Sequence, residues 1–179
     1  DNMITKETLG EVILLQNEAL NKSEIGTPRE GKNEATILDS FALIITGVRR
    51  CGKSTFLNQL IKKKKKAYYL NLEDPRLDGF DLADFNKVEV IMNEIYGKDG
   101  VYFFDEVQNI PKWEKFIRYL IDKKEKVVIT GSNASLLSRE LGTKLTGRYI
   151  QLEMFPFSFR EFLDIKKLNA SLESFKDYF

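Results

Sequence analysis

The most informative stretch of the sequence reads Gly47-Val48-Arg49-Arg50-Cys51-Gly52-Lys53-Ser54-Thr55 and fits the pattern G-x-x-x-x-G-K-[ST]. A short apolar run, 41–46, precedes this stretch, and a segment with helical spacing, 53–63, follows it. Glycine permits the backbone angles and the close approach that such a loop needs. The N–H groups of the loop and of the first helical turn then point at one anion. The pattern in this context predicts a loop that binds the phosphate groups of a nucleotide.

Individual side chains of this stretch have predicted roles of their own. The ammonium group of Lys53 brings a compact charge to the β and γ phosphates, which makes Lys53 a candidate catalytic residue as well. The hydroxyl of Ser54 is a hard oxygen ligand of the kind that Mg²⁺ takes. The alternative, an accidental glycine-rich turn, is rare in chains of this length. The predicted nucleotide-binding residues are Gly47, Val48, Arg49, Arg50, Cys51, Gly52, Lys53, Ser54 and Thr55.

Two carboxylates follow the apolar run 101–104 directly, and they are the second feature that points to chemistry. Asp105, at the end of the predicted strand, can hold the Mg²⁺ shell opposite Ser54. Glu106, one residue later, can orient the attacking water and accept its proton. A pair of acids that merely closes a strand is a common alternative when the pair occurs alone. Because this pair lies downstream of Lys53 with one further predicted strand between, we interpret it as the hydrolytic half of the site.

The acidic pair also separates classes of nucleotide enzyme. A GTPase is expected to carry the patterns D-x-x-G and N-K-x-D, whereas residues 105–108 read D-E-V-Q and residues 86–89 read N-K-V-E. A small-molecule kinase rarely needs a water-activating glutamate beside its metal-binding acid. The sequence therefore favours ATP as the nucleotide, Mg²⁺ as the metal and hydrolysis as the reaction.

Short apolar runs alternate with segments of helical spacing along most of the chain. The runs predicted to be strands are 41–46, 67–72, 101–104, 126–130 and 149–152. The segments predicted to be helices are 5–20, 53–63, 82–96, 112–122 and 134–141. Near-continuous apolar strands separated by helices are typical of a parallel sheet that is covered on both faces. We therefore expect an α/β fold of the P-loop NTPase class, a doubly wound parallel sheet of about five strands with an N-terminal helix.

Ser132 is a further candidate catalytic residue, because it follows the run 126–130 at the predicted carboxyl edge of the sheet. Ligands of such sheets bind beyond that edge, where a hydroxyl can contact the γ phosphate or the attacking water. A Gly-Ser-Asn turn that caps the next helix is the alternative. The residues leave both interpretations open.

Composition excludes several classes of site. The chain has 179 residues, with 28 Lys and Arg against 27 Asp and Glu, so its net charge of +1 requires neither a nucleic acid nor a membrane as partner. It has no His and one Cys, which excludes common zinc sites, histidine-based triads and an internal disulfide. No apolar run is long enough to span a bilayer, and we expect no leader, because the first residues lack a charged segment followed by an apolar one. We expect a cytoplasmic protein without a membrane partner.

Several of these stretches together resemble a known family. They are 47–55, 69–74 (Y-L-N-L-E-D), 104–108 (F-D-E-V-Q), 129–132 (I-T-G-S), 147–148 (G-R) and 155–162 (F-P-F-S-F-R-E-F). Over about residues 41–163 the chain is similar to prokaryotic AAA+-like P-loop ATPases, in which a C-terminal domain of obscure function follows the ATPase domain. The resemblance implies that the strand 126–130 lies between 41–46 and 101–104. It also implies a longer protein, so we expect an N-terminal helix and loop (1–40), an ATPase core (41–165) and the start of a truncated C-terminal region (166–179).

Arg148 is a candidate catalytic residue on the same grounds. In AAA+ proteins the arginine that meets negative charge on the transferred phosphoryl group lies before the last strand and reaches a neighbouring subunit, which implies a homo-oligomer. Arg139 is the competing candidate in the same connection. The alternative for Arg148 is a bond to a surface carboxylate of its own chain.

Two further segments have structural interpretations. The basic run 62–66 is expected to be a solvated helix end rather than a DNA contact. The aromatic segment 155–162 is expected to pack in the core beneath the last strand rather than to stack on bases.

The leading functional hypothesis is an ATPase whose hydrolysis serves a partner domain. Its alternatives are a nucleotide-dependent binding switch with negligible turnover, and an ATPase that reaches nucleic acid only through a missing C-terminal region.

Overall fold

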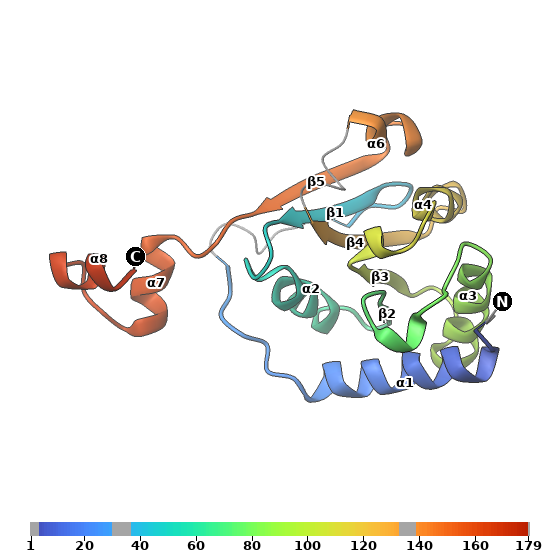
Figure 1. The fold of residues 1–179 in the computed structure, drawn as a ribbon, viewed down its shortest axis with the longest axis horizontal. Coiled ribbons are helices and arrows are strands. Elements are labelled where there is room, and N and C mark those ends of the chain that lie inside the picture. Colours follow the sequence, from blue (N-terminus) through green and yellow to red (C-terminus); the bar gives the residue numbers. More distant parts are fainter. Residues whose placement is uncertain (1–3, 30–36, 133–138, 179) are drawn as a thin grey trace.

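A single parallel sheet of five strands forms the centre of the molecule (Figure 1). The computed structural model describes residues 4–29, 37–132 and 139–178. The strands are β1 (Ala42–Gly47), β2 (Ala67–Asn71), β3 (Val101–Asp105), β4 (Lys126–Ser132) and β5 (Tyr149–Met154). Every neighbouring pair is parallel, in the order β2-β3-β4-β1-β5. The predicted α/β fold is confirmed, and β4 lies between β1 and β3 as the family resemblance implied.

Helices connect the strands, as right-handed crossovers between parallel strands require. They are α1 (Lys6–Lys22), α2 (Lys53–Lys62), η1 (Pro75–Leu77), α3 (Asp84–Tyr96), η2 (Val107–Asn109), α4 (Trp113–Asp122), α6 (Arg139–Lys144), α7 (Phe159–Lys166) and α8 (Leu172–Tyr178). Most of the predicted helix 134–141 lies outside the described residues. None of the helices in the described part of the chain is long and apolar enough to cross a bilayer.

The apolar side chains of the sheet divide between two cores. In β3, Tyr102 and Phe104 face the core that α1, α3 and α4 cover, whereas Val101 and Phe103 face the core that α2 covers. This alternation follows from the period of two in a strand, and burial on both faces explains why the strands read as continuous apolar runs. The two cores hold the carboxyl ends of the strands in register, which positions the loops that follow them.

An aromatic cluster forms the centre of the larger core. Phe85 of α3 is fully buried and stacks on Phe116 of α4, with ring centroids 4.2 Å apart and planes 13° apart. The edge of Phe85 also meets Phe104 of β3 at 5.7 Å and Phe80 at 4.9 Å. Large rings in such contacts bury much apolar area and add a specific stacking energy. The cluster therefore fixes α3 and α4 on the strand that ends in Asp105.

Helix α1 covers the β2 edge of the sheet (Figure 1). The side-chain amide of Gln16 pairs with the backbone of Asn71, accepting from its N–H at 2.7 Å and donating to its carbonyl at 3.1 Å. Asn17 donates to the carbonyl of Tyr69 at 3.0 Å. These amides satisfy backbone groups of an edge strand that would otherwise be open to pairing with another chain.

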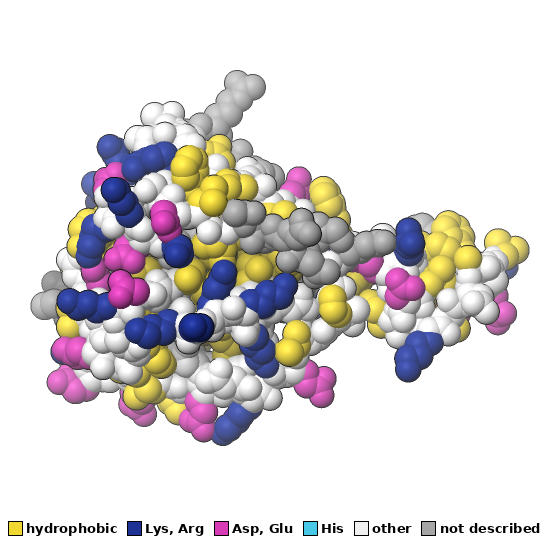
Figure 2. Space-filling view, turned by 180° about the vertical axis from the view of Figure 1, so that it is seen from behind, with side chains coloured by type: hydrophobic (Ala, Val, Ile, Leu, Met, Phe, Trp, Pro, Cys, Tyr) yellow, Lys and Arg dark blue, Asp and Glu magenta, His cyan; other side chains and the backbone are white. Residues whose placement is uncertain are grey.

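The segment 155–162 differs from its sequence-based expectation. Phe155 is 61% exposed, and no residue of α7 is buried. Phe159 instead contacts Phe175 and Tyr178 of α8, so that the two helices form a small aromatic cluster of their own. This part projects from the sheet, and hydrophobic side chains are visible on its surface (Figures 1 and 2). The expected packing beneath the last strand was wrong, because the chain turns away from the sheet after β5.

We predict that Phe85→Ala lowers the free energy of unfolding by about 3–5 kcal/mol, since the substitution leaves a cavity among three aromatic rings. Val90→Ala on the same helix is the control, because Val90 is 47% exposed and its truncation removes little buried area. Urea unfolding followed by circular dichroism measures both. Equal losses in the two variants would contradict the central role of the aromatic cluster.

Candidate active site

The carboxyl ends of all five strands meet at one edge of the sheet. In register, Gly47 at the end of β1 lies beside Ser132 of β4 and Met154 of β5, and Asn71 of β2 lies beside Asp105 of β3. Open parallel sheets bind their ligands beyond this edge. The structure thus brings the glycine-rich loop, the acidic pair and Ser132 to the same end of the molecule.

Gly47 is required by its surroundings. A Cβ at this position would lie 2.4 Å from the carbonyl oxygen of Met154 and 2.6 Å from Sγ of Cys51. No side chain has room there. Only glycine lets the chain pass between Met154 of β5 and Cys51 of the loop. Cys51, whose sulfur limits this space, is itself buried.

Gly52 immediately precedes helix α2 and adopts the left-handed conformation, with φ 95°. Among the described residues no side chain caps this helix, and its first turn contains no acid. The free N–H groups of the first turn and the positive end of the helix dipole therefore remain available to an anion. N–H groups without a hydrogen-bond partner cost free energy when they are buried, and the oxygens of a phosphate group can accept from them. The start of α2 is therefore suited to bind a phosphate.

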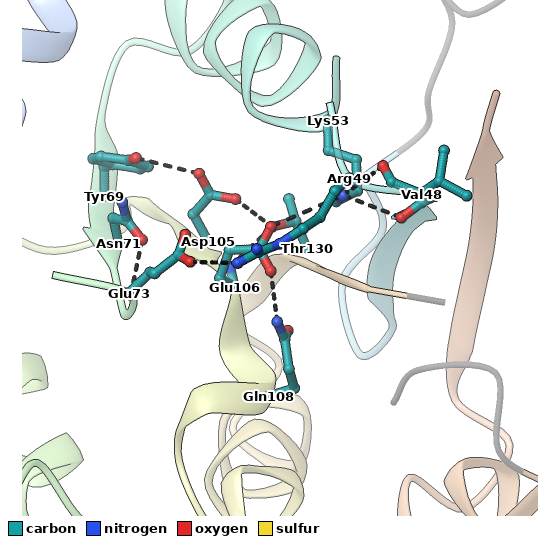
Figure 3. A network of polar contacts seen from close by, with 11 residues as sticks. Val48, Arg49, Lys53, Tyr69, Asn71, Glu73, Asp105, Glu106, Gln108 and Thr130 are labelled. Atoms are coloured by element: carbon teal, nitrogen blue, oxygen red, sulfur yellow. Dashed lines mark hydrogen bonds and ion pairs between the residues drawn. The ribbon is translucent and has the colours of Figure 1, made fainter. Parts of the chain in front are cut away.

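Lys53 lies under the loop with only 5% of its surface exposed. Its ammonium group donates to the carbonyl oxygens of Gly47 and Val48, both at 3.1 Å, and lies 3.9 Å from Oε1 of Glu106 (Figure 3). A buried ammonium needs such partners. The contacts hold the charge of Lys53 between the loop and the acidic pair.

Asp105 is buried, with 3% of its surface exposed. Burial raises the pKa of its carboxyl group; hydrogen bonds from Thr130 and Ser54 act in the opposite direction, the charge of Glu106 raises the pKa further and that of Lys53 lowers it. Tyr69 adds a weak hydroxyl contact at 3.5 Å. A buried carboxylate surrounded by hydroxyl groups is an environment that a bound cation would stabilise.

Glu106 occupies the left-handed region, with φ 54° and ψ 48°, a conformation that is costly for a side chain of this size. Its N–H donates to Oγ1 of Thr130 at 3.0 Å, and its Oε2 accepts from Nε2 of Gln108 at 2.5 Å. Only 19% of its side chain is exposed. The backbone and the carboxylate of Glu106 are thus each held by a separate side chain (Figure 3).

Thr130 connects the two acids and was missed by the sequence analysis. Its hydroxyl accepts from the N–H of Glu106 and donates to the carboxylate of Asp105. Two features of the sequence could have indicated Thr130. It is a polar residue at the end of an apolar strand, and the family resemblance placed that strand beside the acidic strand. Gln108 was also missed as a site residue, although it belongs to the selective D-E-x-Q pattern.

A cavity of about 390 Å³ opens in front of the loop. It is lined by Arg49, Arg50, Gly52, Lys53, Ser54, Thr55, Glu73 and Glu106. Arg49 forms an ion pair with Glu73 at 3.0 Å. The lining combines three cations with the exposed part of the acidic pair, so it is suited to a polyanion held next to a base.

Ser132 and Arg148 lie at opposite ends of the sheet. Ser132 is next to the loop, in register with Gly47. The carbonyl of Arg148 accepts from the N–H of Ala42, the first residue of β1, and its guanidinium forms an ion pair with Asp122 at 2.6 Å. The site of one chain therefore does not contain its own Arg148. A role in a neighbouring subunit stays a prediction for Arg148, and the side chain of Arg139 lies outside the described residues.

Arg29 is a buried residue that the sequence analysis did not single out. From the N-terminal loop it donates to the carbonyl of Cys51 at 3.1 Å and to that of Phe155 at 2.5 Å. It also forms an ion pair with Glu161 of α7 at 3.1 Å, and its guanidinium lies 4.3 Å from the ring centre of Phe157. One side chain thus joins the glycine-rich loop to the segment that follows β5.

Comparisons with known proteins agree with this geometry. A family model described as an AAA domain matches residues 39–163. An uncharacterized protein of Methanocaldococcus jannaschii is 38% identical over 171 residues, which cover 94% of this chain and 38% of that protein. An uncharacterized protein of Haemophilus influenzae is 36% identical over 141 residues, covering 73% of this chain and 35% of its own length. The chain spans less than two fifths of these relatives.

Among solved structures, a DNA polymerase III gamma subunit-related protein of Thermotoga maritima aligns with a TM-score of 0.46 and 10% sequence identity. The alignment covers 93% of this chain and 48% of the other. This likeness is too distant to add to the family match, and the sheet order given above does not depend on it.

We predict that Arg29→Met lowers the free energy of unfolding by about 3–5 kcal/mol, because it leaves Glu161 almost buried without its cation. The double variant Arg29→Met/Glu161→Gln should recover part of this loss, since the uncompensated charge is gone. Lys6→Met is the control, because its ion pair with Glu94 is exposed on both sides and its loss should change stability little.

Urea unfolding of the four proteins measures these differences. A double variant no more stable than Arg29→Met would contradict the assignment of the loss to the unpaired carboxylate.

Proposed function

Because the chain belongs to the AAA domain family, we propose that its cleft binds ATP with Mg²⁺ and that the chain hydrolyses the nucleotide. Family membership supports a nucleotide-binding, ATPase-like function in general. The proposal of hydrolysis rests on one observation, the double hydrogen bond of Thr130 that holds Asp105 and Glu106 in different surroundings. One acid is buried below the loop, and the other faces the cavity, so the two are suited to separate tasks.

The residues present fit the nucleotide and the metal. The space at Gly47, which any Cβ would fill, allows the loop to form, and the uncapped turn of α2 supplies N–H donors. Ser54 and Asp105 are hard oxygen donors of the type that Mg²⁺ takes, and they are the residues that would hold it. When bound, Mg²⁺ would neutralise negative charge on the phosphate oxygens.

In the proposed reaction one group of the chain neutralises phosphate charge, a second accepts a proton, and a third positions the group that accepts it. Lys53 is already directed into the loop and supplies positive charge to the phosphates. Glu106 faces the cavity and accepts the proton of the attacking water. Gln108 fixes the orientation of the Glu106 carboxylate through its hydrogen bond to Oε2. Gln108 is therefore a positioning residue for the base.

We extend the proposal to coupling with a further part of the protein. The support is Arg29, which links the carbonyl of Cys51 in the loop to Phe155 and to Glu161 of α7. A change of the loop on nucleotide binding would act directly on the position of α7 through these contacts. A homo-oligomer in which Arg148 serves a neighbouring subunit also belongs to this proposal.

The test separates binding from turnover with two variants of the full-length protein. Lys53→Ala should lower the affinity for ATP-Mg²⁺ sharply, since a buried phosphate-facing charge is lost. Glu106→Gln should leave that affinity nearly unchanged and lower the rate by about 10²–10⁴, the scale of a positioned general base. Glu94→Gln is the matched control, because it makes the same chemical change at an exposed carboxylate that does not line this cavity.

Calorimetry measures affinity, and phosphate release at saturating ATP-Mg²⁺ measures turnover. Unchanged affinity in Lys53→Ala would refute the binding site. A Glu106→Gln variant as fast as the parent would assign the base elsewhere, and binding without turnover in the parent itself would favour the nucleotide-dependent switch.

We further predict that Gln108→Leu lowers kcat by about 10- to 100-fold, the equivalent of one hydrogen bond to a charged group, while KM for ATP stays within about twofold. Asn109→Ala, at the exposed neighbouring position, should leave both constants unchanged. Steady-state kinetics on folded protein provides the measurement. A rise in KM at constant kcat would mean that Gln108 binds nucleotide instead of positioning Glu106.

A further inference from the structure

A second cavity lies at the end of the sheet opposite to the candidate active site. It has a volume of about 760 Å³ and lies where α1 and α2 end and β2 begins. Four members of the basic run line it, Lys62, Lys64, Lys65 and Lys66, together with Asn17 and Asn21. We call this cavity the lysine cleft. No residue of the loop or of the acidic pair contributes to it.

The lysine cleft carries positive charge without a lining carboxylate. Lys62 donates to the carbonyl of Ser23 at 2.6 Å, and Lys66 donates to the carbonyl of Lys98 at 2.7 Å. Carbonyl partners fix the position of an ammonium group but leave its net charge in place. Each ammonium has three donors, so further N–H groups remain for an anion. Lys64 and Lys65 are exposed between these two anchored lysines.

A solvated helix end accounts for part of this arrangement. Lys62 lies in the last turn of α2 and bonds a carbonyl at the end of α1, where cations suit the helix dipoles. The dipoles do not require four lysines around one concavity, however, and four like charges so close together repel one another. An anionic ligand would relieve this repulsion.

The walls of the lysine cleft identify the class of anion. Tyr96 is half-buried there, and Leu20, Ile61 and Ile95 line the same cavity. A volume of about 760 Å³ exceeds what a single phosphate group fills. A row of cations beside an aromatic ring is the combination with which proteins bind single-stranded nucleic acid, since phosphates meet the lysines and bases meet the ring.

We propose that the lysine cleft binds the phosphate backbone of a single-stranded nucleic acid. This site belongs to the ATPase domain itself and does not depend on a C-terminal region. It is also independent of the proposed ATP site, because the two lie at opposite ends of the strands.

Fluorescence anisotropy of the full-length protein with a labelled oligonucleotide of about 16 nucleotides tests the proposal, in buffer without ATP. Four lysine contacts predict a slope of log K against log salt of about −3 from the cleft. Lys64→Glu/Lys65→Glu should lower the affinity at least about tenfold and make this slope shallower. Both side chains are exposed, so the variant should keep the circular dichroism and thermal transition of the parent.

The matched control is Lys112→Glu/Lys115→Glu, which makes the same change of net charge at two exposed positions elsewhere on the molecule. If this control binds the oligonucleotide about as tightly as the parent, the result supports the lysine cleft as the binding site. The same result in Lys53→Ala would show that the cleft is separate from the proposed ATP site. Equal losses in both double variants would overturn the proposal, because they would show attraction by net charge alone.

Two further outcomes decide the class of ligand. Loss of affinity in Tyr96→Ala, in folded protein, would support contact with the bases. The parent could instead bind vesicles that contain phosphatidylserine and not the oligonucleotide. If Lys64→Glu/Lys65→Glu abolished that vesicle binding, the proposal would be overturned in favour of a membrane surface.

Discussion

The close passage of the chain at Gly47 is the constraint on which the rest of the site depends. β1 lies between β4 and β5 and must end where the carbonyl of Met154 and the sulfur of Cys51 leave no space for a side chain. Because the chain can turn there, α2 begins only a few residues later with its N–H groups uncovered and Lys53 at its first position. The direction of the Lys53 charge thus follows from a packing restriction in the centre of the sheet.

The second level of organisation is the junction of β3 and β4. Asp105 and Glu106 are consecutive, and the same backbone could point them in several directions. The hydroxyl of Thr130 removes this freedom by accepting from one residue and donating to the other. The left-handed conformation of Glu106 is then maintained by its surroundings, as expected where strain is concentrated at a functional site. The geometry of the acidic pair thus depends on a neutral side chain from a neighbouring strand.

The two ends of the sheet have different relations to the rest of the protein. At the carboxyl end, Arg29 joins the loop to α7, and α7 with α8 projects from the domain with aromatic contacts of its own. At the amino end, the lysine cleft gathers charge beside Tyr96. The proposed nucleotide site and the proposed polyanion site thus lie at opposite ends of the strands, on separate surfaces of the domain.

The residues alone were enough to derive the α/β fold, the five strands and the helices α1 to α4 to within two residues, the glycine-rich loop and the acidic pair. These features are local: they depend on apolar periodicity and on neighbours within about ten positions, which a linear pattern contains. The helices α7 and α8 were not among the predicted helices. Tertiary structure decided the remainder. Thr130 bonds across 24 and 25 positions and Arg29 across 126, distances at which no periodicity indicates a partner. The segment 155–162 was misplaced for the same reason, since its aromatic residues could satisfy either the main core or α8, and only the path of the chain after β5 selects between them.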